Sequence, residues 1–210
     1  MPSDTRTRMI EATVQALQRH GVAGMSFTDV LRASGAARGA IYHHFPRGKA
    51  QLVAEAAARN GHDVRIHLAG LPADSPQAVV QAFLAAVRPA VQASAAGGGC
   101  AVAAITVGAD AGSDGLRQVA ADALASWADQ LAELLARSGL ASGEAADLAA
   151  MLLALLQGAH VMCRAAGSLQ PFDQAARAVT ALAQSRYPGP WAPESPEGTE
   201  SRLPTLTTSG

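Results

Sequence analysis

Cysteine is scarce in this chain: Cys100 and Cys163 are its only thiols, and no CxxC spacing joins them. This scarcity excludes a disulfide framework and provides no zinc-binding pattern. The adjacent His43 and His44 do not change this conclusion, because neighbouring helix positions point about 100° apart. We therefore expect reduced thiols, no metal and no cofactor.

Bulky side chains and long apolar segments are also few. Aromatic residues make up only 4% of the sequence while alanine is abundant, so its helices should pack closely. Polar and charged residues occupy positions 3–8, where a signal peptide would be apolar. The longest apolar stretch, 148–163, carries Gln157 and His160 and is too short to span a bilayer. The sequence predicts a cytoplasmic protein that does not enter a membrane.

Net charge is nearly absent, at −1, but its distribution is uneven. Residues 1–50 hold seven Arg or Lys against three Asp or Glu, a balance of +4. Residues 51–210 hold nine against fourteen, a balance of −5. A basic N-terminal part is what phosphate binding requires. Taken alone, the same distribution also fits chance variation over solvated surfaces.

The first 50 residues carry the signals of short helices separated by glycine. Apolar residues recur at helical spacing over 10–17, and Gly21 marks the end of that helix. Ser26, with Asp29 three positions later, resembles a capping box in which Asp replaces the usual Glu, and it opens a second helix. Gly35 then permits a sharp turn.

A third helix follows this turn, with Ile41 and Phe45 four residues apart on its inner face. Its outer face suits a DNA major groove: Arg38 offers a bidentate donor, and Gly39 allows close approach of the duplex. Arg38 read alone is equally an ordinary solvated residue, and Tyr42 is equally structural. The candidate DNA-binding residues are Ser26, Thr28, Arg38, Gly39, Ala40, Tyr42, His43 and Lys49.

Residues 34–49, SGAARGAIYHHFPRGK, closely resemble the recognition segment of TetR-family transcriptional repressors. The resemblance extends over about residues 4–60 and implies a helix-turn-helix that binds DNA. Two positions depart from the usual pattern, because Ala37 and Ala40 stand where a hydroxyl is frequent. Contacts that those hydroxyls make are therefore not expected here.

Beyond residue 50 apolar residues recur mostly at helical spacing, and no run predicts a strand. Proline and glycine separate the segments. We expect helices at 49–68, 76–95, 101–110, 114–138, 144–167 and 172–186, with Pro89 bending the second of them. The tail, 188–210, is rich in Pro, Ser, Thr and Glu with few apolar residues, so it is predicted to be disordered.

This second part also resembles a narrower group, the ligand-binding domain of the LmrA/YxaF branch. The similar segments are GCAVAA at 99–104, QGA at 157–159 and PFD at 171–173. Ala101 stands at a position where that branch frequently has proline. The resemblance implies an all-α fold with a helix-turn-helix DNA-binding domain over 1–48. A helical ligand-binding and dimerisation domain would follow over 49–187.

The resemblance further implies a homodimeric repressor that binds a palindromic double-stranded DNA operator and is released by a small ligand. The expected subunit contact uses the last two long helices, with Leu152, Leu155, Leu156, Ala159, Val179 and Leu182. We expect an apolar inducer, uncharged or weakly cationic, because few charged residues lie at inward positions. The candidate pocket residues are Phe83, Val87, Ile105, Trp127, Leu131, Met151, Leu155 and His160. The apolar residues of both sets, the subunit contact and the pocket, could equally form the hydrophobic core of a single chain.

Two other functions remain open at this stage. A cysteine-dependent enzyme would use Cys100 or Cys163 as its nucleophile, but the sequence offers no recognisable base or oxyanion motif, and the flanks are apolar. An architectural DNA-binding protein without a ligand is the other alternative, and a body without a cavity would favour it.

Overall fold

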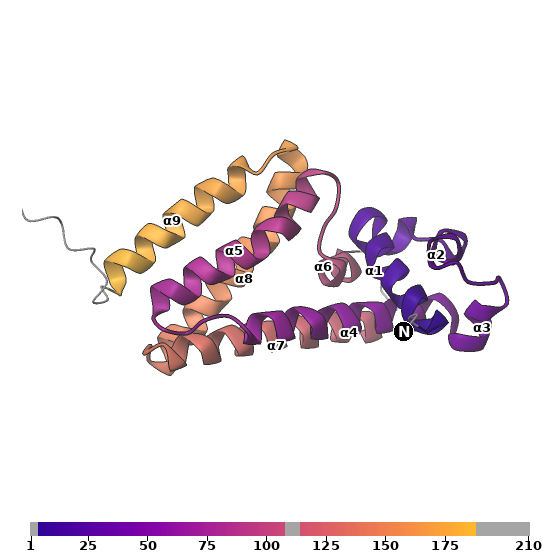
Figure 1. Ribbon diagram of the computed structural model, residues 1–210, viewed down its shortest axis with the longest axis horizontal. Helices are drawn as coiled ribbons and strands as arrows, with labels where there is room; N and C mark the ends of the chain where they lie inside the picture. Colours follow the sequence, from indigo (N-terminus) through magenta and orange to yellow (C-terminus); the bar gives the residue numbers. More distant parts are fainter. Residues whose placement is uncertain (1–3, 108–113, 188–210) are drawn as a thin grey trace, which may run out of the picture.

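The computed structural model describes residues 4–107 and 114–187, and within these ranges it contains helices and no strand. This confirms the all-α prediction. The molecule is elongated, with α1–α3 at one end and α9 at the other (Figure 1). Its helices are α1 Thr5–Gly24, α2 Phe27–Ser34, α3 Ala40–His44, α4 Gly48–Ala69, α5 Pro76–Ala95, α6 Ala101–Val107, α7 Asp114–Arg137, α8 Ser142–Ala166 and α9 Gln170–Arg186. The tail at 188–210, predicted to be disordered, lies outside the described residues.

The first three helices form a small unit, called the head below (residues 5–47). Regular helical geometry in α1 breaks at Gly21, whose φ of 65° lies in the left-handed region, as predicted from the glycine. Gly35, with φ of 65°, ends α2 in the same way. The core of the head includes Met9, Leu17 and Phe45, each at most 1% exposed.

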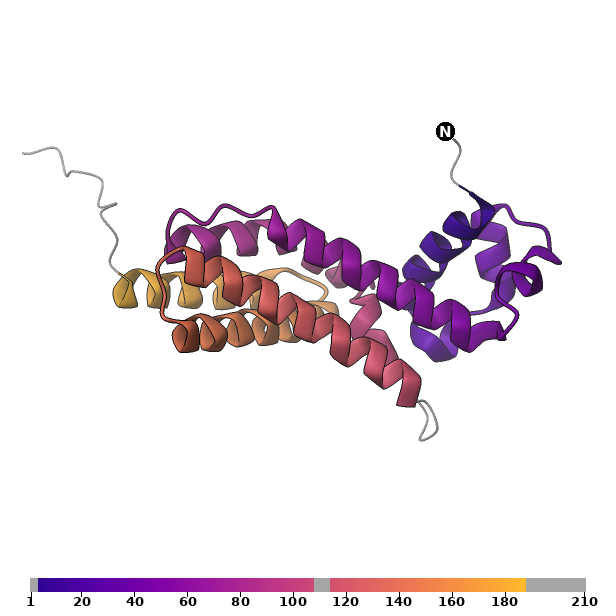
Figure 2. The same ribbon diagram turned by 90° about the horizontal axis from the view of Figure 1, so that it is seen from below.

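The long helix α4 joins the head to the remaining helices, called the body below (residues 70–187). It packs against α1 near its start and against α7 along its length, as Figure 2 shows from below. Gly61 permits this close approach, because a Cβ at that position would lie only 2.8 Å from the Cβ of Ala123. Trp127 of α7 is buried beside Gly61 and donates a hydrogen bond from Nε1 to the Gly61 carbonyl at 2.8 Å.

In the body, α5 and α8 pack together and α9 covers both of them. The hydroxyl of Ser75 caps α5 by accepting from the Ala78 amide at 3.1 Å. α5 continues through Pro89 as one helix. α9 begins at Gln170, two residues before its predicted start, because a proline in the first turn needs no amide partner and Pro171 is therefore accommodated there.

In α8 and α9, the last two helices of the body, the apolar residues that are buried and those that are exposed differ from the prediction. Leu152, Leu156, Ala159 and Val179 were expected at a subunit contact, but all four are buried in the core of the single chain. Leu182 is exposed and Leu155 is half-buried, so only these two of the six predicted contact residues remain accessible at the surface of the chain.

α5 and α8 are also long and apolar enough, by length and composition alone, to cross a membrane. About two fifths of each apolar window, 39% and 44%, is buried inside the body. Both helices are therefore partly buried in the body.

Candidate nucleic-acid interface

The second helix of the head begins at a side-chain cap. Ser26 Oγ accepts from the Asp29 amide at 3.2 Å and donates to the Asp29 carboxylate at 2.6 Å. The capping interaction predicted from sequence is present, but the carboxylate returns to the hydroxyl rather than to a backbone amide. Asp29 also accepts from Arg32 at 3.1 Å. The Ser26 hydroxyl is thus occupied in holding α2.

Aromatic and apolar contacts fix α3 against the head. Ile41 and Phe45 are buried, which confirms the predicted inner face of this helix. The ring of Tyr42 meets that of Phe27 edge to face, with centroids 6.3 Å apart. Because Tyr42 is 64% exposed as a residue, it can both support α3 and present its hydroxyl outward.

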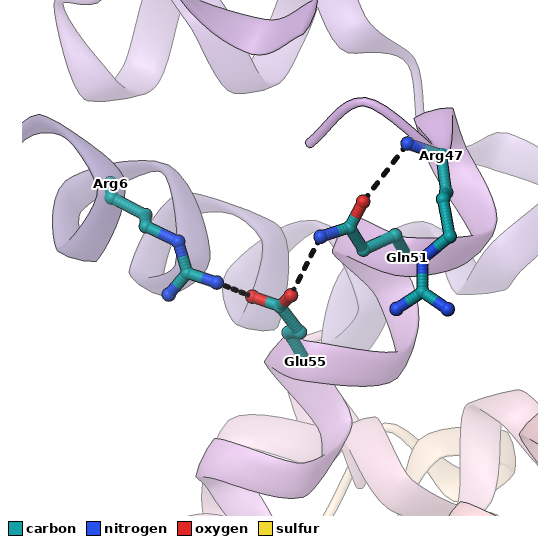
Figure 3. A network of polar contacts seen from close by, with 4 residues as sticks. All are labelled: Arg6, Arg47, Gln51 and Glu55. Carbon is teal, nitrogen blue, oxygen red and sulfur yellow. Dashed lines mark hydrogen bonds and ion pairs between the residues drawn. The ribbon is translucent and has the colours of Figure 1, made fainter. Parts of the chain in front are cut away.

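A polar network holds the turn between α3 and α4 (Figure 3). Arg6 of α1 forms an ion pair with Glu55 of α4. Gln51 donates to the same carboxylate at 3.0 Å and accepts from the Arg47 amide at 3.0 Å. The Arg6 guanidinium also lies 5.2 Å from the centre of the Phe45 ring. These contacts join α1, the end of α3 and the first turns of α4 into one scaffold.

Three cations around α3 have no carboxylate partner. In the described part of the chain, Arg38, Arg47 and Lys49 form no side-chain hydrogen bond or ion pair. By contrast, Arg32 and Arg59 are paired with nearby aspartates. Unpaired cations on one face attract phosphate, because no local carboxylate offsets their charge.

Most of the predicted DNA-binding residues lie in α3 or in the segments directly before and after it. Arg38 and Gly39 lie in the turn before α3, which begins at Ala40, and Tyr42 and His43 are exposed on the helix itself. A Cβ at Gly39 would meet nothing within 4 Å, so this backbone is open to an approaching duplex. Thr28 is exposed at the start of α2, and Ala40 and Lys49 are half-buried.

Arg47 belongs to the same face but was absent from the predicted set. Its side chain is exposed, while its backbone amide is tied to Gln51. Its place directly after Pro46, between the third helix and α4, is the sequence signal that could have identified it.

In the body, the predicted pocket residues are for the most part ordinary core. Phe83, Ile105, Trp127 and Leu131 are at most 1% exposed, packed among helices. Val87 and Leu155 are half-buried. Met151 does not face the interior: it is 36% exposed on the surface of α8, because the residues beside it, Leu152 and Leu153, take the inward face.

A cavity lies elsewhere, where the end of α1 meets α6 and α8. Its volume is about 680 Å³, and of the eight predicted pocket residues only His160 lines it. The ring Nδ1 of His160 is 2.7 Å from the hydroxyl of Ser94. Burial lowers the pKa of His160, so its neutral ring is favoured.

The two cysteines show no feature of an activated nucleophile. Burial raises the pKa of the Cys100 thiol, more than hydrogen bonds from the Ala103 and Val102 amides lower it. Cys163 is fully buried. Among the described residues there is also no group of three or more metal-ligating side chains.

Comparison with known families gives two matches along the chain. Residues 9–56 match the family described as bacterial regulatory proteins of the tetR family. Residues 76–178 match the C-terminal domain of LmrA/YxaF-like transcriptional regulators. Together the two matches cover more than two thirds of the chain.

Individual relatives agree with these matches. The HTH-type transcriptional regulator Rv0196 of Mycobacterium tuberculosis is 28% identical over 190 residues, covering 87% of this chain and 96% of that protein. The HTH-type transcriptional regulator LmrA of Bacillus subtilis is 25% identical over 170 residues, covering 80% of this chain and 90% of that protein. The crystal structure of a TetR regulatory protein from Rhodobacter sphaeroides superposes with a TM-score of 0.74 at 20% identity, covering 85% and 98% of the two chains.

Proposed function

Because this chain belongs to the TetR family of bacterial transcriptional regulators, in its LmrA/YxaF-like branch, we propose that it is a dimeric, ligand-released repressor. The observation that carries the DNA-binding part is the set of three cations around α3, exposed Arg38 and Arg47 and half-buried Lys49. These cations lack carboxylate partners, and the Arg6–Glu55–Gln51 network holds the helix beside them.

In this proposal, residues 1–48 form the DNA-binding domain and α3 enters the major groove. Arg38 contacts a base edge or a phosphate, whereas Arg47 and Lys49 contact phosphates. Because α3 has only five residues, Ala40–His44, one head can read only a few base pairs. Specificity therefore requires two heads, and two-fold symmetry requires a palindrome with half-sites about one helical turn apart or a multiple of it.

The surface of α8 and α9 supports dimer formation. Exposed apolar side chains on α8 recur at Met151, Val161 and Met162, with half-buried Leu155 between them, and Leu182 adds to them from α9. Positions 151, 155, 158, 161, 162 and 165 repeat at three- and four-residue spacing, so they share one helix face. Apolar surface of this extent in a soluble protein favours contact with a second copy.

Two measurements test the proposal. Selection from a random duplex library should recover a palindromic sequence, and footprinting should protect two equivalent half-sites. Light scattering should give the mass of a dimer at micromolar concentration, and Met162→Glu should reduce that mass to one chain. Ile66→Glu is the matched control, because Ile66 is 54% exposed on α4, outside the α8 and α9 face. Recovery of a single asymmetric site by a monomer would overturn the proposal.

Ligand release is the remaining part of the proposal. The cavity of about 680 Å³ between the end of α1 and the body is large enough for a small molecule, and it favours a ligand-responsive regulator over a purely architectural DNA-binding protein. A repressor of this kind acts in the cytoplasm, where it meets chromosomal DNA. The raised pKa of Cys100 argues against the alternative of a cysteine-dependent enzyme.

A further inference from the structure

The head is joined to the body by the continuous helix α4, and a second connection lies away from that helix. There α1 packs against α6, which in turn packs against α7 (Figure 1). A unit held along one helix can pivot about it, whereas a second contact off that line fixes its orientation. The orientation of the head on the body therefore depends on this second connection.

The second connection includes the end of the regular part of α1. Helical geometry stops at Gly21, whose backbone has φ of 65° and ψ of −174°. A helix end leaves the carbonyls of its last turn without amide donors. Arg19 lies in that turn, and its carbonyl accepts a hydrogen bond from Arg164 Nη2 of α8 at 3.3 Å. Arg164 thus brings a donor and a positive charge to a helix C-terminus, which both favour.

The same guanidinium also holds the segment between α5 and α6. Arg164 Nη1 donates to the Gly98 carbonyl at 3.2 Å. Gly98 is itself firmly placed, because its amide donates to the Ala93 carbonyl at 2.8 Å. A Cβ at Gly98 would lie only 2.8 Å from that carbonyl oxygen, so the turn requires glycine. Arg164 therefore joins a fixed turn of the body to the end of α1.

The geometry of these two bonds restricts movement of α1 against the body. They use two nitrogens of one planar guanidinium, which holds its acceptors in a fixed arrangement. The backbones are also close here, since a Cβ at Gly99 would lie 3.2 Å from the Gln18 carbonyl of α1. Because the two acceptors belong to different segments, α1 cannot turn relative to the α5–α6 segment without loss of at least one bond.

Arg164 also lies beside the proposed subunit contact. On α8 it follows exposed Met162 by two residues and directly precedes exposed Ala165, while exposed Val161 is one turn earlier. The helix that would meet the second subunit thus holds its own head through one side chain. In a dimer, two such connections determine the separation and relative orientation of the two heads.

We infer that Arg164 is a positioning residue that sets the separation of the two DNA half-sites the dimer accepts. In this role Arg164 contacts no DNA: α3 recognises each half-site, and Arg164 fixes where the two α3 helices lie. A duplex with matching half-site separation binds without disturbing either connection. A duplex with another separation binds only if the Arg164 hydrogen bonds break or the DNA deforms, and both cost free energy. This inference rests on the proposed dimeric repressor.

The test uses the palindrome recovered by selection and duplexes in which the spacer between its half-sites is one or two base pairs longer or shorter. Fluorescence anisotropy gives the affinity of the full chain for each duplex. The native chain should bind the selected spacing best. Arg164→Ala should reduce its preference over the altered spacings roughly tenfold, because two hydrogen bonds are lost from each subunit.

Three further measurements separate positioning from charge, packing and DNA reading. Arg137→Ala removes the same charge from α7, where Arg137 pairs with Glu133 of its own helix at 3.4 Å, and it should keep the native preference. Arg164→Met keeps the apolar stem without the donors, so its preference should fall as in Arg164→Ala. Selection with Arg164→Ala should recover the native half-site sequence with a wider range of spacers, because the head itself is intact.

Several outcomes would overturn the inference while leaving the proposed repressor in place. They are a native preference retained in Arg164→Ala or Arg164→Met, an equal loss in Arg137→Ala, and an altered half-site sequence in Arg164→Ala. Equal binding of the native chain to every spacing would overturn it in the same way. A native chain that binds no duplex would instead contradict the proposed function, and the inference with it.

Discussion

The clearest quantitative consequence of the head concerns the salt dependence of DNA binding. Around α3, each subunit presents three cations without carboxylate partners, Arg38, Arg47 and Lys49, so the two heads of a dimer present six. If all six neutralise phosphates, the slope of log affinity against log salt is about −5. Between 50 and 200 mM salt the affinity should then fall roughly 10³-fold.

Lys49→Ala removes two phosphate contacts from the dimer. The slope should therefore become less steep by about 2, and the loss of affinity over the same salt range should shrink to roughly 150-fold. The effect should be similar on the selected palindrome and on a random duplex, because a phosphate contact carries no base information. Fluorescence anisotropy with a labelled duplex at a series of KCl concentrations measures both quantities.

Arg59→Ala is the matched control for this variant. It removes the same charge from the same helix, but Arg59 is already paired with Asp63 at 2.9 Å. Ten residues of helix separate it from Lys49, a distance of about 15 Å, which exceeds the screening length of about 8–10 Å. The salt dependence of DNA binding by Arg59→Ala, measured as the slope of log affinity against log salt, should match that of the native chain. An unchanged slope in Lys49→Ala, or an equal change in both variants, would refute the assignment of phosphate contacts to this face.

Three further predictions follow from single side chains. Arg38→Ala should cost about 1–3 kcal/mol of binding to the selected palindrome and much less on a random duplex, if Arg38 contacts a base edge; equal losses in the two titrations would make it a phosphate contact. Trp127→Phe should lower the free energy of unfolding by about 1–2 kcal/mol, because the hydrogen bond to Gly61 and part of the buried ring are lost. Urea denaturation measures this loss, and DNA affinity should stay unchanged. His160 has a lowered pKa in the folded chain, so the unfolded chain takes up a proton first as pH falls below the ordinary value of 6.5. Stability should fall from that pH down to the folded pKa, and urea titrations of His160→Gln should show a smaller decline.

The head was predictable from sequence because its signals are local. Gly21 and Gly35 adopt the positive φ that the sequence indicated, and Ser26 caps α2 through its hydroxyl. Each of these conformations depends on residues no more than a few positions apart. The precise start of α3 was less well defined, because Arg38 and Gly39 continue the turn for two residues before regular helix begins.

The division of α8 into inner and outer faces could not be predicted in the same way. Its sequence is apolar around most of its circumference, so helical spacing does not identify the side that faces the core. Leu152 and Met151 are neighbours with similar hydropathy, yet the first is fully buried and the second is 36% exposed. Only the packing of α5, α7 and α9 against α8 separates the two faces. For this reason the predicted subunit contact contained four residues of the core.

The location of the cavity was missed for a related reason. A pocket was expected where large apolar side chains are dense, around Phe83 and Trp127; both side chains are at most 1% exposed, and the cavity described above lies elsewhere. Space remains instead where the chain carries glycine and alanine, at residues 97–99 and along α6. In the sequence those glycines indicated only a linker. Two hydrogen bonds from Arg164, at 3.2 and 3.3 Å, cross this thinly packed junction, and each has a backbone carbonyl as its acceptor. Both contacts are exposed, so each contributes only modestly to holding the head against the body.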